Sequence, residues 1–283
     1  MFDELEIEFR KKEIPTDTPD FYDHPNFIKE EQQDPSYLIK FAKFVAEKPY
    51  SDEYLVKAEK IITDVAKILS KQLIDNGRQG ACVDISAILA RILERKGIWC
   101  ACIKGSCTIE FPKKSKEETI YYWTADHGEF TAGHAWVFAP PFSVVDITLK
   151  QQPYTGTKKT YIPEVLLIKD AKKVPSTIED IISPEVRVLM KAQGIPKHLM
   201  LQYAASEMKL IQEVFPAQLI EINETKFKFS PVAAHASIEA LPGMKNMKFN
   251  GMYPYDMYQK IIKDKVPSIA QQEIQVTPTT CLI

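Results

Sequence analysis

The spacing of apolar residues along the chain changes from a helical period to a strand period and then back. Between residues 51 and 97, apolar side chains recur three and four positions apart, as on a helix with one face toward a core. This pattern predicts one helix that begins at Ser51 and stops near Gly77, and a second helix from Cys82 to Lys96.

Between residues 98 and 168, β-branched and aromatic residues become frequent and the apolar positions partly alternate. Five strands are predicted, at residues 98–111, 119–124, 134–139, 143–148 and 161–168. The Pro140–Pro141 pair fits a tight connection between the third strand and the fourth. Helical spacing returns at 177–193 and 196–214. Helices, then consecutive strands, then helices favour an α+β fold in which helices pack on an antiparallel sheet.

These patterns divide the chain into three regions. Residues 1–50 are polar and interrupted by prolines, which predicts an irregular arm that wraps the core and holds one short helix near residues 35–46. Residues 51–170 form the predicted core of helices and strands. Residues 171–283 are predicted to be a helical or irregular C-terminal extension.

Composition and charge narrow the class of protein. The chain has 283 residues, of which 45% are apolar and 26% charged, as in folded globular proteins. The formal net charge of -2 argues against a general nucleic-acid binder. No stretch approaches the roughly 18 apolar residues of a membrane helix, and the first residues lack an apolar leader. We therefore expect a cytoplasmic protein with reduced thiols and no membrane association.

Five cysteines cannot all pair, so at least one thiol is left over. Cys82 follows a loop with two glycines and begins the second predicted helix, where the positive helix end favours a reactive thiolate. Cys100, Cys102 and Cys107 are predicted to be buried packing thiols, because no second cysteine pair completes a zinc site. Cys281 has no clear role. We expect neither a metal nor an organic cofactor.

A histidine and an aspartate lie on the two strands that flank the proline pair. His134 begins one strand, and Asp146 lies between Val145 and Ile147 in the next, where an unpartnered carboxylate would be costly to bury. A turn centred near residue 140 makes paired positions add up to about 280, a condition that 134 and 146 satisfy. The two residues are therefore predicted cross-strand neighbours. A thiol, an imidazole and an orienting carboxylate are the elements of thiol catalysis.

The order of these residues resembles the core of the transglutaminase-like superfamily. The likeness rests on a cysteine at a helix start, His-Ala-Trp-Val on a strand and Val-Asp-Ile-Thr on the next strand, and it covers roughly residues 64–154. The segment LARILERKGIWCACIKG also resembles the family's passage from nucleophile helix to strand. That superfamily includes protein-crosslinking enzymes, thiol peptidases and amidases, in which a nucleophile helix packs against an antiparallel sheet.

The resemblance implies a catalytic triad of Cys82, His134 and Asp146. Cys82 would attack an acyl carbon, His134 would accept the thiol proton, and Asp146 would orient the imidazole. The backbone N–H of Cys82 is a natural oxyanion donor, and Gln79 is a candidate side-chain donor. We expect hydrolysis of an amide or peptide-type bond in a protein, peptide or small amide substrate. Protein-glutamine transamidation is the alternative acyl transfer.

Two further alternatives remain open. Arg78–Cys82 also resembles the nucleophile motif of arylamine N-acetyltransferases, although Gln79 replaces a glycine of that motif. A non-catalytic binding or scaffold protein on the same fold is the alternative from another class.

Several other side chains are candidates for a functional role. Trp136 shares the strand face of His134 and is a candidate wall of the site, although core packing is the simpler interpretation. His127 lies in the loop before His134 and is read as a solvated loop residue. Methionines are frequent in the C-terminal third, from Met190 to Met257; gap filling is the default interpretation, and an adaptable binding surface is the alternative.

Overall fold

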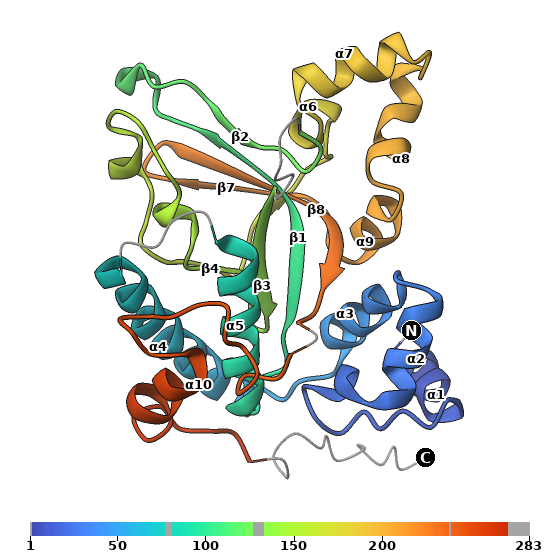
Figure 1. The fold of residues 1–283 in the computed structure, drawn as a ribbon, viewed down its shortest axis with the longest axis vertical. Helices are drawn as coiled ribbons and strands as arrows, with labels where there is room; N and C mark the ends of the chain where they lie inside the picture. Colours follow the sequence, from blue (N-terminus) through green and yellow to red (C-terminus); the bar gives the residue numbers. More distant parts are fainter. Residues whose placement is uncertain (1, 77–80, 127–132, 238, 271–283) are drawn as a thin grey trace, which may run out of the picture.

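An antiparallel sheet curls through the centre of the molecule, with helices packed around it (Figure 1). The computed structural model describes residues 2–76, 81–126, 133–237 and 239–270. Its eight strands follow the order β5-β4-β3-β1-β8-β7-β6, and β2 pairs with β1 beside that path. Within the described ranges, every pair of neighbouring strands in this sheet is antiparallel. The predicted α+β class and the antiparallel sheet are therefore confirmed.

The strands are β1 (Ala101–Glu110), β2 (Ile120–Tyr122), β3 (His134–Ala139), β4 (Phe142–Asp146), β5 (Leu166–Ile168), β6 (Lys172–Lys173), β7 (Gln218–Ile222) and β8 (Thr225–His235). The first five lie where the sequence predicts strands, and β5 is shorter than predicted. Pro140 and Pro141 alone connect β3 to β4, as expected for a tight connection.

The α-helices are α1 (Phe2–Lys11), α2 (Pro25–Gln33), α3 (Tyr37–Glu47), α4 (Asp52–Asn76), α5 (Cys82–Arg95), α6 (Ile178–Ile181), α7 (Pro184–Ala192), α8 (Met200–Ala204), α9 (Met208–Val214) and α10 (Pro254–Met257). Short turns of other helix types are η1 (Phe21–Asp23), η2 (Lys113–Ser115), η3 (Leu149–Gln151), η4 (Lys158–Tyr161), η5 (Lys197–Leu199) and η6 (Tyr258–Ile262). Helices α4 and α5 occupy the ranges that the apolar spacing predicts.

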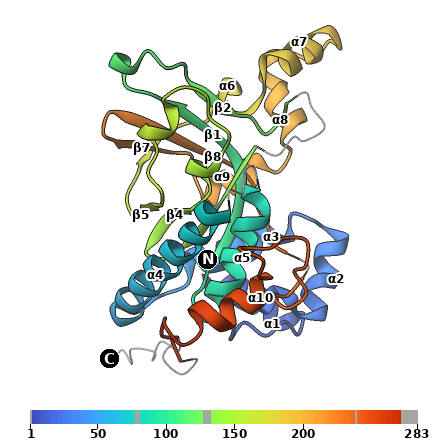
Figure 2. The same cartoon turned by 60° about the vertical axis from the view of Figure 1, so that its left-hand side comes forward.

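The central helix α5 is buried on nearly every side. Eleven of its residues are buried, because α4 packs on it (Figure 2) and because it lies against β1 and β3. Two thiols of the following segment contact its backbone: Cys100 Sγ lies 3.7 Å from the carbonyl oxygen of Ala90, and Cys102 Sγ lies 3.4 Å from that of Ser86. These cysteines therefore fix the helix to the sheet.

The N-terminal region differs from the predicted irregular arm. Residues 2–47 contain three α-helices, and their aromatic side chains join the main core. The ring of Phe9 contacts those of Phe21 and Phe44 at centroid distances of 5.2 and 5.7 Å. Arg91 of α5 binds both carboxylate oxygens of Asp23 at 2.7 Å. The prolines mark helix starts, such as Pro25 at the first turn of α2, rather than an absence of helix.

The C-terminal region also differs from the prediction, because it supplies part of the central sheet. Strand β8 pairs with β1 from Glu110↔Lys226 to Cys102↔His235, and it pairs with β7 on its other edge. No strand is predicted beyond residue 168 from the sequence. The described part of residues 171–283 is therefore not a separate helical or irregular extension.

The predicted helix at 177–193 is two helices. The chain leaves the helical conformation at Ile182 and Ser183, and Pro184 begins α7 with the Ser183 side chain as its cap. A proline inside a helix would clash with the preceding turn, whereas the first helical position accepts it.

Candidate functional site

Cys82 is the first residue of α5, where the backbone N–H groups of the first turn have no partner within the helix. The whole residue is 4% exposed. One turn later, Ser86 Oγ donates a 3.1 Å hydrogen bond to the carbonyl oxygen of Ala135 on β3. This bond holds the start of the helix beside the start of β3, as Figure 1 shows.

His134 begins β3 at a point where two glycines allow backbones to approach closely. It lies opposite Gly105 of β1, and Gly133 before it has a φ of +54°. A Cβ on Gly133 would lie 2.4 Å from the carbonyl oxygen of Gly105, and a Cβ on Gly105 would lie 2.1 Å from that of Ser230. Side chains at either position would push apart the strands that place His134.

His134 Nε2 lies 2.6 Å from Asp146 Oδ2, and both side chains are fully buried. The register is not the one predicted, because Val137 pairs with Val145 and the pairing shifts before Ala139↔Phe142. His134 and Asp146 are therefore diagonal neighbours on one face of the sheet rather than directly opposite. Their side chains still meet, since residues two apart on a strand share a face.

Local hydrogen bonds hold Asp146 as a carboxylate. Its Oδ1 accepts from the Thr148 backbone N–H at 2.7 Å, the Thr148 hydroxyl at 2.9 Å and the Leu149 N–H at 3.1 Å. Burial by itself raises the pKa of Asp146, but the charge of His134, its hydrogen bond and the bonds from Thr148 outweigh burial and lower that pKa. The carboxylate is therefore charged and pre-oriented.

The imidazole of His134 lies between Asp146 and Cys82. Burial alone lowers the pKa of His134, but the charge and hydrogen bond of Asp146, followed by the hydrogen bond and charge of Cys82, raise it to about 10. Nε2 faces the carboxylate, so Nδ1 is the nitrogen left for the thiol. Nδ1 is buried and has no hydrogen-bond partner within the described part of the chain. The influence of the Cys82 thiol on the pKa of His134 places that thiol near the same ring. The structure thus brings together Cys82, His134 and Asp146.

Three aromatic side chains surround this group, and of these only Trp136 is predicted from the sequence. Tyr122 of β2 pairs with Cys107, two residues along β1 from the partner of His134, and its ring centroid lies 5.8 Å from the imidazole. Phe229 of β8 lies 6.1 Å from the same ring. Trp136, at 6.4 Å, stacks beside it and is buried, so it serves as a wall and packs in the core.

The side chains of Tyr122 and Tyr154 lie next to each other beside the site. Tyr154 donates a 2.7 Å hydrogen bond to the carbonyl oxygen of Leu149, and its hydroxyl is also bonded to that of Tyr122. Burial raises the pKa of both phenols, and Asp146 and Cys107 raise each further. Because Tyr154 lies outside any predicted element, no local pattern could have placed it here.

The remaining predicted residues fall outside the group. Gln79, His127 and Cys281 lie outside the described residues. Burial raises the pKa values of Cys100, Cys102 and Cys107, which suits packing thiols. Among the described residues, no three histidine, cysteine or acidic side chains gather in a way that could hold a metal ion.

In the described ranges, no helix is long and apolar enough to cross a membrane. Comparisons of the chain with models of known families, with curated proteins and with solved structures find no match.

Proposed function

We propose that the protein is a cysteine-dependent acyl-transfer enzyme with a transglutaminase-like core, in which Cys82, His134 and Asp146 form the catalytic triad. The observation that carries this proposal is the buried His134–Asp146 pair, which leaves Nδ1 of the imidazole facing Cys82. A histidine that only packs in the core does not need a buried carboxylate on one side and a thiol on the other.

The proposed reaction has two steps. Proton transfer from Cys82 to His134 gives a thiolate and an imidazolium, which the carboxylate of Asp146 stabilises. The thiolate attacks the carbonyl carbon of an amide, and the collapsing intermediate expels the amine, which takes the proton from His134. A water molecule, deprotonated by His134, then attacks the thioester and releases an acid and the free thiol.

The oxyanion of each tetrahedral intermediate needs preorganised donors. The backbone N–H of Cys82 has no intrahelical partner and is the donor that we propose. Gln79 stays a candidate for the second donor.

Hydrolysis of an amide or peptide bond is the reaction that we favour, because water is always available as the acceptor. Transamidation by a primary amine uses the same acyl-enzyme and differs only in the second step. The reduced thiols of such an enzyme suit the cytoplasm.

The test compares the alkylation of individual cysteines by iodoacetamide in the wild type and in His134→Gln, read by peptide mass spectrometry. We expect Cys82 to react at least about tenfold faster than Cys281 near pH 6, because an imidazolium beside the thiol favours the thiolate. His134→Gln should remove that advantage while the reactivity of Cys281 stays the same. Equal rates at the two cysteines in the wild type would contradict the proposal and favour a binding or scaffold protein.

A second measurement separates the two acyl-transfer reactions. The wild type is treated with p-nitrophenyl acetate, with and without a primary amine, and acetylation of Cys82 is followed by mass. Turnover without the amine indicates hydrolysis, and turnover only with it indicates transamidation. Cys82→Ala is the control and should give neither.

A further inference from the structure

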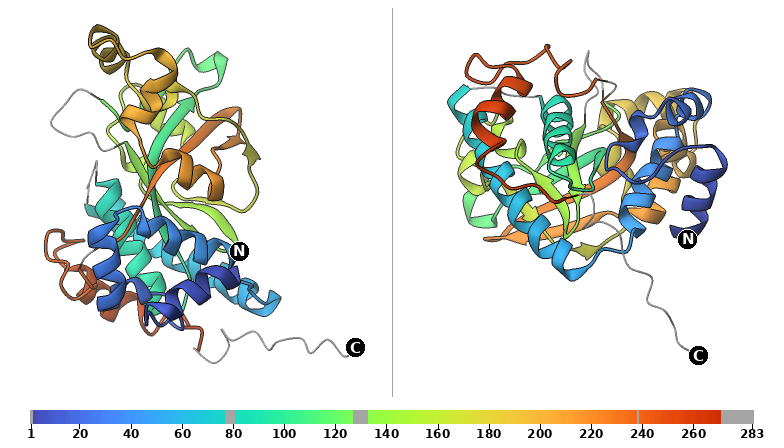
Figure 3. Two further views of the ribbon diagram at one scale, coloured as in Figure 1. Left: turned by 90° about the vertical axis from the view of Figure 1, so that its right-hand side faces the viewer. Right: turned by 90° about the horizontal axis from the view of Figure 1, so that it is seen from below.

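The segment from α6 to α8 forms a small unit of its own beside the sheet. Six buried residues make a separate apolar cluster there: Ile178, Ile181, Ile182, Met200, Ala205 and Val232. Figure 1 and the left view of Figure 3 place α7 at the end of the molecule that lies farthest from the N-terminal helices. None of the nine residues of α7 is buried.

This unit exposes more large apolar side chains than other parts of the described chain. Three of the nine exposed large apolar residues lie on it, Val188, Leu189 and Tyr203, and a fourth, Leu210, lies on α9. Val188 is 69% exposed and Tyr203 is 66% exposed. Exposed apolar side chains gathered on the helices of one small unit mark an interaction site more often than single residues scattered over the surface do.

A pocket of about 610 Å³ opens between α6, α7 and the η5–α8 segment. Its apolar lining comes from Ile178, Pro184, Val188, Ile195, Pro196 and Met200. Met200 is one of the methionines of the C-terminal third, for which the sequence favours either gap filling or an adaptable surface. A flexible thioether in a pocket lining suits a variable apolar occupant.

The charged groups that line this pocket are all cations: Arg187, Lys191 and Lys197. Glu179 is the carboxylate near them, and it lies 3.2 Å from Arg187 and 3.7 Å from Lys197. No ion pair joins Lys191 to a carboxylate within the described ranges. Arg187 and Lys197 therefore share one carboxylate while Lys191 has no ion pair among the described residues, and the pocket has an excess of positive charge.

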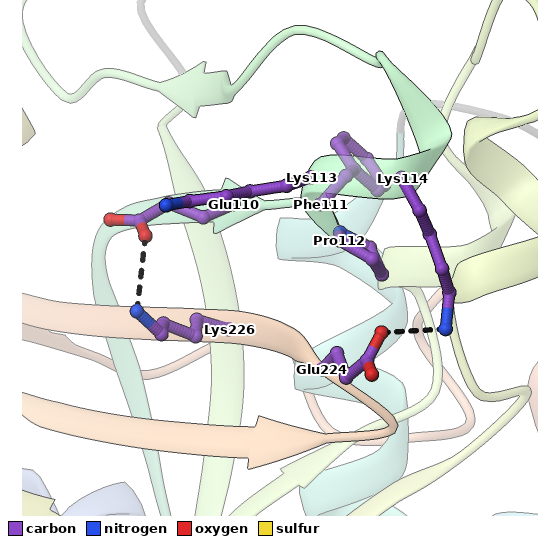
Figure 4. Close-up of a pocket in the computed structure, with 7 residues that line it drawn as sticks. All are labelled: Glu110, Phe111, Pro112, Lys113, Lys114, Glu224 and Lys226. Carbon is purple, nitrogen blue, oxygen red and sulfur yellow. Dashed lines mark ion pairs between the residues drawn. The ribbon is translucent and has the colours of Figure 1, made fainter.

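The pocket in Figure 4 gives the contrast. Two of its three lysines pair with carboxylates of the same pocket, with Lys226 at 3.6 Å from Glu110 and Lys114 at 2.7 Å from Glu224. Its charges largely balance, so it has no comparable preference for an anionic partner.

We propose that the pocket of the α6–α8 unit docks an apolar segment of a protein partner that also carries acidic side chains. Apolar side chains of the partner fill the pocket, and its carboxylates meet Lys191 and the pair of Arg187 and Lys197. The exposed apolar side chains of Leu189 and Tyr203, on the same two helices as the pocket, favour a polypeptide over a small molecule. The proposal is independent of the triad.

The unit is also fastened to the segment that leads toward His134. The Ala125 N–H donates to the carbonyl oxygen of Ile181 at 2.9 Å, and the Ser183 N–H donates to that of Ala125 at 2.9 Å. The indole N–H of Trp123 donates to the carbonyl oxygen of Glu179 at 2.8 Å. A polypeptide held at this pocket is therefore held next to the strand that precedes the candidate site.

The test uses the purified full chain on an array of synthetic peptides of about 15 residues, sorted into acidic-apolar, basic-apolar and acidic-polar classes. We expect retention in the acidic-apolar class, weakened by added salt. The double variant Lys191→Glu with Lys197→Glu should reduce retention about tenfold or more, and Val188→Ser should also reduce it. The control is Lys11→Glu with Lys29→Glu, which changes the net charge equally at another pocket.

Three outcomes would overturn the proposal. They are an absence of retained peptides, equal retention of the basic-apolar class, and retention by the Lys191/Lys197 variant equal to that of the control. A fourth outcome comes from analytical sedimentation, which measures the oligomeric state of the wild type and of Val188→Ser. A dimer that Val188→Ser dissociates would identify a second copy of the chain as the occupant instead.

Discussion

Replacing Asp146 by asparagine separates the charge of the carboxylate from its shape. An asparagine Oδ1 can still accept the hydrogen bonds from Thr148 and Leu149, so its amide nitrogen must face Nε2 of His134. An amide N–H cannot accept the proton of Nε2. The imidazole must then carry its proton on Nδ1, which removes the lone pair that faces Cys82.

The size of the effect follows from the pKa of His134. Burial alone would lower that pKa below its ordinary value of 6.5, and Asp146 is the largest of the influences that instead raise it to about 10. The difference of 3.5 corresponds to roughly 5 kcal/mol in favour of the imidazolium. Without the carboxylate charge, burial dominates, and we expect the pKa of His134 in Asp146→Asn to lie below 6.5.

Two measurements check this expectation. A ¹⁵N titration of the histidine side chains should show His134 moving from about pH 10 to below pH 6.5. Alkylation of Cys82 near pH 6 should slow about tenfold or more, because a neutral imidazole no longer favours the thiolate. If His134 of the variant still titrates near pH 10, or if Cys82 reacts as fast as before, the carboxylate does not act as argued.

The buried pair of His134 and Asp146 makes the unfolding free energy depend on pH. The pKa of Asp146 is lowered from 3.8, so its contribution is present above pH 3.8 and is lost as the pH falls through the lowered value. The pKa of His134 is raised, so its contribution is complete below pH 6.5 and is lost as the pH rises through about 10. Urea unfolding should therefore separate wild type from Asp146→Asn most between pH 3.8 and 6.5.

Two further predictions concern the framework of the site. Gly105→Ala should lower the unfolding free energy by about 3 kcal/mol, because its Cβ would lie 2.1 Å from the Ser230 carbonyl oxygen. Gly194→Ala, whose Cβ would have nothing within 4 Å, should lower it by about 1 kcal/mol. Thermal melting compares the two variants, and equal losses of stability would contradict the close approach at Gly105. Burial, opposed by Arg91, raises the pKa of Glu94 from 4.5 to about 8. The unfolding free energy of the wild type should therefore fall, relative to that of Glu94→Gln, as the pH rises from 4.5 to about 8. Urea unfolding across that range tests this, and parallel curves for the two proteins would count against it.

The elements that the sequence predicts well are those with a strong local period. Helices α4 and α5 and strand β3 lie within a residue or two of their predicted bounds, because each has a regular apolar face and a clear end signal. Strand β8 is not predicted from the sequence although residues 226–230 alternate polar and apolar side chains, a signal that the prolines around it obscure. The turn before it, at Asn223 and Glu224, has positive φ angles of 48° and 64°, as tight hairpins require.

The candidate site was predictable in its residues but not in its register or its walls. Strand alternation placed His134 and Asp146 on one face, which is enough for contact even though the pairing is offset from the predicted one. Tyr122 and Tyr154 come from a short strand and a loop, and only the tertiary fold brings their hydroxyls together. The local sequence around Tyr122 or Tyr154 cannot predict this contact, because nothing near either residue in the chain indicates the other.

Strand β8 has a consequence for the order in which the molecule can assemble. The candidate thiol at Cys82 and the imidazole at His134 are synthesised before Thr225, the first residue of β8. Until β8 emerges from the ribosome, one edge of β1 has no partner, and that bare edge is open to pairing with other chains. Because β1 also carries the glycine opposite His134, the candidate site cannot take its final geometry before β8 is made. A nascent chain would therefore depend on protection of that edge until residues 225–235 have emerged.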